Sequence, residues 1–86
     1  MSKVEIYTTP TCPYCTAAKS LLAERGVEFE EVTVLDPEAR AAMVDRANGR
    51  RTVPQIFIGD THVGGYDDMA ALDRRGQLDA LLDRER

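Results

Sequence analysis

Two cysteines three positions apart carry the clearest chemistry in this 86-residue chain, and they are its only cysteines. Cys12 and Cys15 enclose a Cys-Pro-Tyr-Cys motif where a predicted strand leads into a predicted helix. The first turn of a helix has N–H groups without helical partners and carries about half a positive charge. A Cys12 thiolate would lie on these groups, and cysteines in such places have pKa values of about 3.5–7.5 rather than about 8.5.

Cys15 follows one helical turn later and would point back toward Cys12. From there its thiol could attack a mixed disulfide formed on Cys12 and release the reduced partner. The spacing and its place between strand and helix therefore predict thiol–disulfide exchange, with Cys12 as the nucleophile and Cys15 as the resolving thiol.

Three other roles for the pair are less favoured. A structural disulfide across so short a step would constrain little chain entropy and would be reduced in the cytosol. A zinc site needs two further ligands, and His62 is the only other candidate of the usual nitrogen or sulfur kind, so we expect no metal. The third alternative is an inert buried pair.

The elements on either side of the motif follow from the sequence pattern. Residues 3–8 alternate and carry β-formers, which predicts a strand that ends just before the cysteines. Residues 13–25 predict a helix, because Pro13 suits the first helical position and Gly26 suits the residue that ends a helix.

The middle of the chain predicts a second strand and a second helix. Residues 28–34 predict the strand, although their apolar alternation is imperfect, as a bulge or an early strand end would explain. Residues 36–38, Asp-Pro-Glu, supply a cap, a first-position proline and a first-turn acid for the helix, which residues 48–49 stop.

The last third of the chain predicts a hairpin and helical segments. Residues 55–58 have the pattern of a buried strand, and a tight turn at residues 59–60 leads to residues 61–63 as its partner. Asp67 or Asp68 is the expected cap of a third helix, and one or two further helical turns follow it.

The order β-α-β-α-β-β-α predicts an α/β fold with a four-stranded mixed sheet and helices on both faces. At this length we expect a single domain over residues 1–86. The 43% of hydrophobic and 30% of charged residues are ordinary for a folded protein.

Charge and composition exclude several functional classes. A net charge of −4 does not attract phosphate backbones, so we expect no nucleic-acid partner. No apolar run approaches the roughly 20 residues that cross a bilayer, and no leader-like apolar stretch precedes the first strand. One short cysteine pair does not fit a disulfide-rich secreted domain. We therefore expect a cytoplasmic protein without membrane attachment.

Two further segments converge on the cysteine pair. Thr52-Val53-Pro54 precedes the third strand, and a cis bond before Pro54 would turn the backbone toward a ligand, whereas a trans proline would simply begin an edge strand. The residues alone leave both open. Residues 64–68, Gly-Gly-Tyr-Asp-Asp, open the third helix and could offer N–H groups to a ligand carboxylate and an aspartate to a ligand ammonium.

Together these motifs resemble those of the glutaredoxin family, specifically its small bacterial dithiol type, which is called glutaredoxin 3. The resemblance spans essentially the whole chain and is carried by residues 5–8, 12–15, 52–58 and 64–68. It implies a thioredoxin fold with strand order 2-1-3-4, a cis proline at position 54, and glutathione as a co-substrate with no bound cofactor.

The resemblance also implies roles for single residues. Cys12 would be the site of glutathionylation and Cys15 the resolving thiol. The backbone of Val53 would pair with the cysteinyl part of glutathione, and Asp68 would bind its ammonium group. The residues implied to contact glutathione are Tyr14, Arg46, Thr52, Val53, Pro54, Gly65, Tyr66, Asp67 and Asp68.

Within this set the carboxylates of glutathione have separate partners. N–H groups around Tyr66 and Asp67 would take the γ-glutamyl carboxylate. Arg46 would reach the glycyl carboxylate, a role that Arg50 and Arg51 could share.

One position departs from the family pattern. Many members have a lysine three residues before the nucleophilic cysteine, where this chain has Thr9. Stabilisation of the thiolate would then depend mainly on the helix terminus. We therefore expect Cys12 to be less acidic than in lysine-bearing relatives.

The sequence thus predicts a glutathione-dependent thiol–disulfide oxidoreductase that reduces protein disulfides and glutathione mixed disulfides. Expected partners are glutathione and disulfide-bearing or glutathionylated proteins, of which the family suggests ribonucleotide reductase, and we expect a monomer. One alternative is a redoxin reduced by thioredoxin reductase. Another is a carrier of a glutathione-ligated [2Fe–2S] cluster, which Pro13 disfavours because cluster-binding relatives generally have glycine or serine there. A plain adaptor would not need Cys12.

Overall fold

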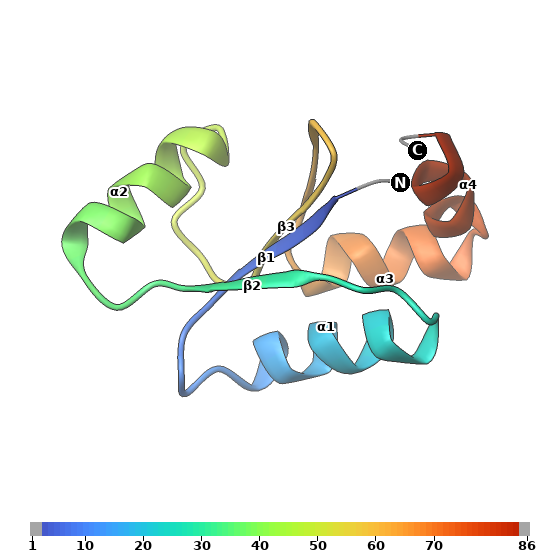
Figure 1. Ribbon diagram of the computed structural model, residues 1–86, viewed down its shortest axis with the longest axis horizontal. Helices are drawn as coiled ribbons and strands as arrows, with labels where there is room; N and C mark the ends of the chain where they lie inside the picture. The colour runs from blue at the N-terminus through green and yellow to red at the C-terminus, as the bar shows by residue number, and fades with distance from the viewer. Residues whose placement is uncertain (1–2, 85–86) are drawn as a thin grey trace.

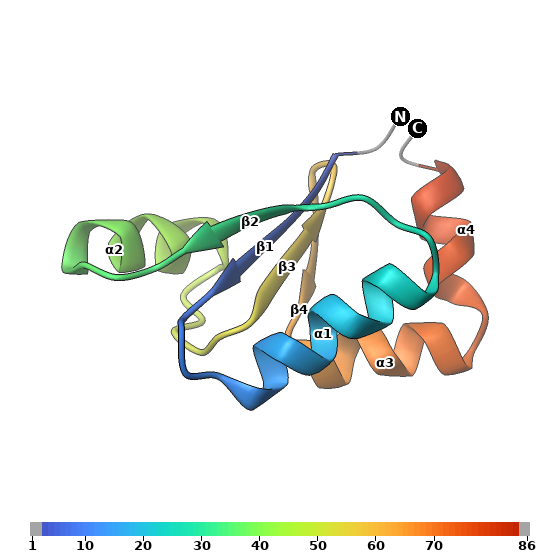
Figure 2. The same cartoon turned by 60° about the horizontal axis from the view of Figure 1, so that its bottom comes forward.

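A computed structural model describes residues 3–84 of the chain. Helix α2 covers one face of the sheet, and α1, α3 and α4 lie on the other (Figures 1 and 2). In chain order the elements are β1 (Val4–Thr8), α1 (Pro13–Glu24), β2 (Glu30–Thr33), α2 (Pro37–Arg46), β3 (Gln55–Ile58), β4 (Thr61–Gly64), α3 (Tyr66–Arg74) and α4 (Gln77–Arg84).

The strands form one sheet in the order β2-β1-β3-β4. Strands β1 and β2 are parallel, as a β-α-β crossover requires. The β1/β3 and β3/β4 pairs are antiparallel. The predicted mixed sheet, its strand order and the helices on both faces are therefore confirmed.

The two faces of the sheet differ in chemistry. On the side of α1, α3 and α4, alternate residues of β1 and β3 join the helices in an apolar cluster made of Val4, Ile6, Ala18, Leu22, Ile56, Ile58, Met69, Leu78 and Leu81. On the side of α2, the intervening residues include Tyr7 and Phe57, whose rings meet edge to face at 5.5 Å. Arg46 of α2 places its guanidinium carbon 4.1 Å from the centre of the Phe57 ring.

The helix starts follow their sequence signals at two of three places. Cys12 caps α1 with Pro13 in its first turn, and Asp36 caps α2 by accepting the Ala39 N–H at 2.7 Å. The prediction that Asp67 or Asp68 caps α3 was wrong, because the cap is Gly65. Asp68 instead reaches back from the first turn and accepts the Gly65 N–H at 2.9 Å.

Two boundaries also differ from the prediction. Strand β2 covers only Glu30–Thr33, so its imperfect alternation reflects a short strand. The helical turns predicted at the end of the chain form a separate helix, α4, which adds an eighth element. Gly76 separates α4 from α3 and has a φ of 70°, a conformation that glycine adopts without steric cost.

Candidate redox site and ligand groove

Cys12 and Cys15 are joined by a disulfide at the start of α1. The Cys15 N–H donates to Cys12 Sγ at 3.1 Å, so the sulfur itself caps the helix. Cys12 is partly exposed, whereas Cys15 is 1% exposed. The outer sulfur can therefore meet a substrate, and the inner sulfur can react only with a group that has already reached Cys12.

The N–H contact decides what the reduced pair can do. A thiolate on Cys12 would keep the Cys15 N–H as a charge-assisted donor and would lie at the positive end of the helix dipole. Both interactions favour the ionised form of the thiol, which is the nucleophilic form. The only lysine of α1, Lys19, is engaged elsewhere, because its Nζ lies 3.0 Å from Glu31 Oε2.

A backbone ledge at residues 52–54 lies beside the cysteine pair. The Val53–Pro54 peptide bond is cis, as the family resemblance implies. The Val53 carbonyl oxygen is 3.8 Å from Cys12 Sγ, although the two residues are 41 positions apart. The ledge therefore borders the sulfur at which a ligand thiol would react.

The ledge and the start of α3 line one groove with a volume of about 210 Å³. It brings together all the residues predicted to contact glutathione except Arg46, and it adds Arg50. Its lining consists of Tyr14, Arg50, Thr52, Val53, Pro54, Gly65, Tyr66, Asp67 and Asp68. Tyr14, at 63% exposure, stands at the outer edge, with its ring centre 6.3 Å from that of Tyr66.

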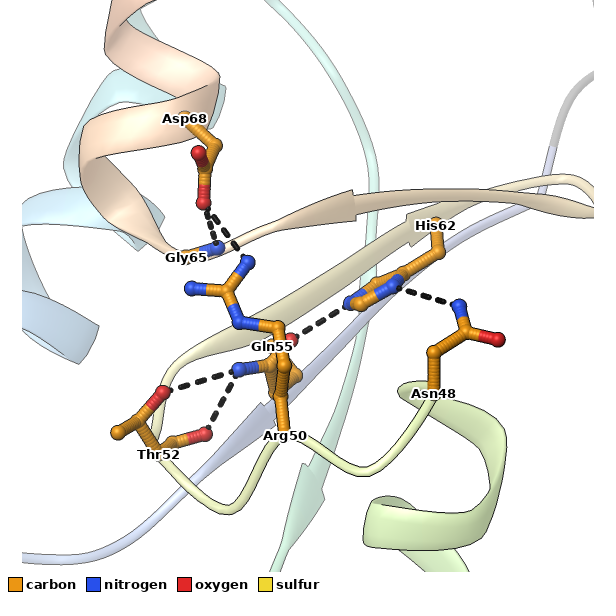
Figure 3. A network of polar contacts seen from close by, with 7 residues as sticks. All are labelled: Asn48, Arg50, Thr52, Gln55, His62, Gly65 and Asp68. Atoms are coloured by element: carbon orange, nitrogen blue, oxygen red, sulfur yellow. Dashed lines mark hydrogen bonds and ion pairs between the residues drawn. The ribbon is translucent and has the colours of Figure 1, made fainter.

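Asp68 at the start of α3 and Arg50 in the loop between α2 and β3 place an acidic and a basic group in this groove (Figure 3). Asp68 Oδ2 accepts the Gly65 N–H and lies 3.0 Å from Arg50 Nη1. The Gly65 N–H, and then Arg50, lower the pKa of the Asp68 carboxyl. Gly64 has a φ of 115°, and a side chain there would collide with the Asp68 carboxylate and the Arg50 guanidinium.

Arg46 is not placed in the groove. Its Nη2 lies 2.8 Å from Glu5 Oε1, its Nη1 donates to Tyr7 Oη at 3.1 Å, and its guanidinium covers the Phe57 ring. These partners lie on the α2 side of the sheet. Arg50 is the basic residue that the fold brings to the ligand side.

A larger hollow of about 790 Å³ lies between β4, α3 and α4. Unlike the groove, it is not lined by Val53, the residue whose carbonyl oxygen lies beside Cys12. Within residues 3–84, no cluster of three or more histidine, cysteine or acidic side chains is arranged to hold a metal ion. No helix in that range is long and apolar enough to cross a membrane.

Comparison with known proteins gives consistent results. A family model described as Glutaredoxin matches residues 4–63. Glutaredoxin 3 of Escherichia coli (strain K12) is 52% identical over 82 residues, which cover 95% of this chain and 99% of that protein.

Solved structures of similar proteins share the architecture. The solution structure of glutaredoxin from Brucella melitensis gives a TM-score of 0.84 at 57% identity and covers 95% of this chain and 89% of that chain. The crystal structure of a buckwheat glutaredoxin–glutathione complex gives a TM-score of 0.86 at 28% identity and covers 96% of this chain and 78% of that chain.

Proposed function

Because the chain belongs to the glutaredoxin family and is a thiol–disulfide oxidoreductase, we propose that glutathione is its co-substrate and that it reduces both glutathione mixed disulfides and protein disulfides. Family membership confirms the resemblance inferred from the motifs. The glutathione complex of the buckwheat relative supports the choice of co-substrate.

One observation carries the proposal: the groove is lined by Val53, which lies beside the reactive sulfur, and by the acidic start of α3. The Val53 carbonyl lies 3.8 Å from Cys12 Sγ. Asp68 lies in the first turn of α3. A tripeptide with a central thiol and an α-amino acid head fits this arrangement, because its thiol would meet Cys12 and its ammonium would meet Asp68.

The γ-glutamyl carboxylate of glutathione also finds partners. The first turn of α3 has N–H groups and no side-chain cap bond at Gly65, which suits this carboxylate. Arg50 lines the groove beside Asp68, 3.0 Å from its Oδ2, so it adds a positive charge at the same end of the ligand.

With a glutathione mixed disulfide, a single cysteine suffices. The Cys12 thiolate attacks the glutathione sulfur, the bond between glutathione and the target breaks, and the target leaves as a thiolate. A second glutathione thiolate then attacks the glutathione sulfur bound to Cys12. This step forms glutathione disulfide and restores the Cys12 thiolate, so electrons and sulfur bonds balance.

With a protein disulfide, both cysteines are needed. Cys12 attacks one sulfur of the target and forms a mixed disulfide, while the other target sulfur leaves as a thiolate. Cys15 loses its proton and attacks Cys12 Sγ, which releases the second target thiol and gives the disulfide described above. Two glutathione molecules then reduce this bond and leave as glutathione disulfide.

These steps set the working conditions. Glutathione must be present mainly as the thiol, which supports a reducing compartment such as the cytoplasm. The targets are proteins with accessible or glutathionylated cysteines, and ribonucleotide reductase is one that the family suggests.

The test is an assay of reduction of a glutathione mixed disulfide, coupled either to glutathione and glutathione reductase or to thioredoxin reductase alone. We expect turnover only in the first arm. Turnover in the second arm alone would instead indicate a redoxin reduced by thioredoxin reductase. Anaerobic reconstitution with iron and sulfide should give a colourless protein, whereas a stable coloured dimer would favour the cluster carrier.

A further inference from the structure

A chain of polar contacts runs behind the ledge, on the side of the sheet that faces α2 (Figure 3). Its centre is Gln55, the first residue of β3, which is completely buried. Its Nε2 donates to the Thr52 carbonyl at 3.0 Å and lies 3.1 Å from Thr52 Oγ1. Its Oε1 lies 2.7 Å from His62 Nε2.

These partners determine which atoms of this network carry hydrogens. Because the Gln55 amide nitrogen is used on Thr52, its Oε1 faces His62 as an acceptor, and His62 Nε2 must carry the hydrogen. His62 Nδ1 is then the acceptor for Asn48 Nδ2, at 3.3 Å. This is the neutral tautomer of His62, and burial followed by the charge of Arg50 lowers the pKa of its ring.

The His62 ring is itself held in place. It stacks on Phe57 with ring centres 4.8 Å apart and an angle of 21° between the planes. Asn48 holds one ring nitrogen and Gln55 the other. The donor on Nε2 is therefore aimed at Gln55 by packing as well as by hydrogen bonds.

The contacts of Gln55 close a short loop around the ledge. Its amide binds Thr52, three residues earlier, so Val53 and Pro54 lie between two tethered positions. A buried amide costs free energy unless it is hydrogen-bonded, which keeps this tether closed. The same loop presents the Val53 carbonyl to Cys12.

We propose that Gln55 is a positioning residue for the thiol–disulfide reaction. It holds the ledge at residues 52–54 beside Cys12, and His62 keeps the Gln55 amide in the orientation that binds Thr52. The part of this inference that concerns ligand binding rests on the proposed use of glutathione. Neither side chain lines the groove, so both act through the backbone that they hold.

The decisive variants remove hydrogen bonds and keep volume. Gln55→Met retains a side chain of similar shape without a donor or acceptor. His62→Phe retains a ring that can stack on Phe57 but has no donor, and His62→Gln is its matched control because it retains a donor near the same position. Each is measured for KM and kcat with the mixed disulfide of cysteine and glutathione, and for the rate of Cys12 alkylation.

We expect Gln55→Met to raise KM about tenfold and His62→Phe about threefold, with kcat within about twofold of the parent, as loss of one or two hydrogen bonds to the ledge implies. Alkylation of Cys12 should stay at the parent rate, and His62→Gln should keep the parent KM. An unchanged KM in folded Gln55→Met would overturn the inference. If Gln55→Met does not fold, equal KM values for His62→Phe and His62→Gln would overturn it.

A second substrate separates this inference from the proposed function. The same variants are assayed on a protein disulfide with dithiothreitol as the reductant, which needs no glutathione. If the parent protein shows no preference for glutathione mixed disulfides, the proposed co-substrate is wrong. A higher KM of Gln55→Met for the protein disulfide would still support the positioning role, and an unchanged KM would refute it.

Discussion

Two helix N-termini face the same groove, at the starts of α1 and α3, and they are capped in opposite ways. In α1 the cap is the reactive atom itself, since Cys12 Sγ accepts the Cys15 N–H. In α3 the cap is Gly65, which has no side chain, and Asp68 reaches back to its N–H. One terminus therefore stabilises an anion that belongs to the protein, and the other is suited to an anion that a ligand brings.

The start of α2 provides a reference for both. Asp36 caps it by accepting the Ala39 N–H, an arrangement that fully serves the helix. Asp36 is exposed and does not line the groove. The unpaired N–H groups at the start of a helix can therefore stabilise a nucleophile, bind a ligand or stabilise the helix. The residue at the cap decides which of these they do.

The largest expected effect comes from removing the anion at α1. Cys12→Ser replaces the thiol with a hydroxyl that does not ionise near neutral pH, so turnover should fall to the uncatalysed background in both disulfide assays. Because serine can still cap the helix, the thermal midpoint of the reduced protein should change little. Substantial activity in this variant would mean that the start of α1 does not supply the nucleophile.

Removal of the Cys15 thiol should affect reduction of glutathione mixed disulfides and reduction of protein disulfides differently. Cys15→Ser should retain reduction of glutathione mixed disulfides, because that route uses only Cys12. It should lose most reduction of protein disulfides, because no second thiol can release the target. Both rates are measured with glutathione and glutathione reductase. Equal losses in the two assays would refute the division of roles between the partly exposed and the buried sulfur.

At α3, the expected effect falls on binding. Asp68→Asn keeps an acceptor for the Gly65 N–H but loses the charge. KM for a glutathione mixed disulfide should therefore rise by a factor of about 10 to 150 while kcat is kept, which corresponds to a lost charge-assisted hydrogen bond of about 1.5–3 kcal/mol. Asp67→Asn is the matched control, because that residue is proposed to contribute only its backbone N–H. Equal KM values for the two variants would show that the Asp68 charge does not contribute to ligand binding.

The smallest effect on activity is expected at α2. Asp36→Ala should lower the free energy of unfolding by about 1 kcal/mol through loss of its cap. KM, kcat and the alkylation rate of Cys12 should equal those of the parent. A changed KM would show that the start of α2 is coupled to the groove and would weaken the contrast among the three helices.

The sequence was sufficient to predict the order of the elements along the chain and the place of the cysteines, because strong local signals mark each of these elements. The order of the strands in the sheet was implied by the family resemblance. The cap of α3 was not predictable in the same way. Asp67 and Asp68 are both good cap residues, and only the backbone conformation at Gly65 shows that the helix starts earlier. The place of Arg46 outside the groove was not predictable from the sequence, because its partners Glu5 and Tyr7 come from a strand far away in the chain.

The contacts behind the role proposed for Gln55 were missed for a related reason. A polar residue at the start of an apolar strand was a visible signal, but its partner His62 is defined only by the pairing of β3 with β4. Motifs therefore identify which residues do chemistry, and tertiary contacts decide which other residues hold them.

The most direct test is the pH dependence of alkylation of Cys12 by iodoacetamide, measured in Cys15→Ser so that a single thiol reacts. A sulfur held by the start of α1 without a neighbouring lysine should show an apparent pKa between about 4.5 and 7.5 and should react at pH 7 faster than free cysteine. A value below about 4.5 would refute the weaker acidity attributed to Thr9. A value near 8.5, with the reactivity of free cysteine, would contradict stabilisation of the thiolate by the helix.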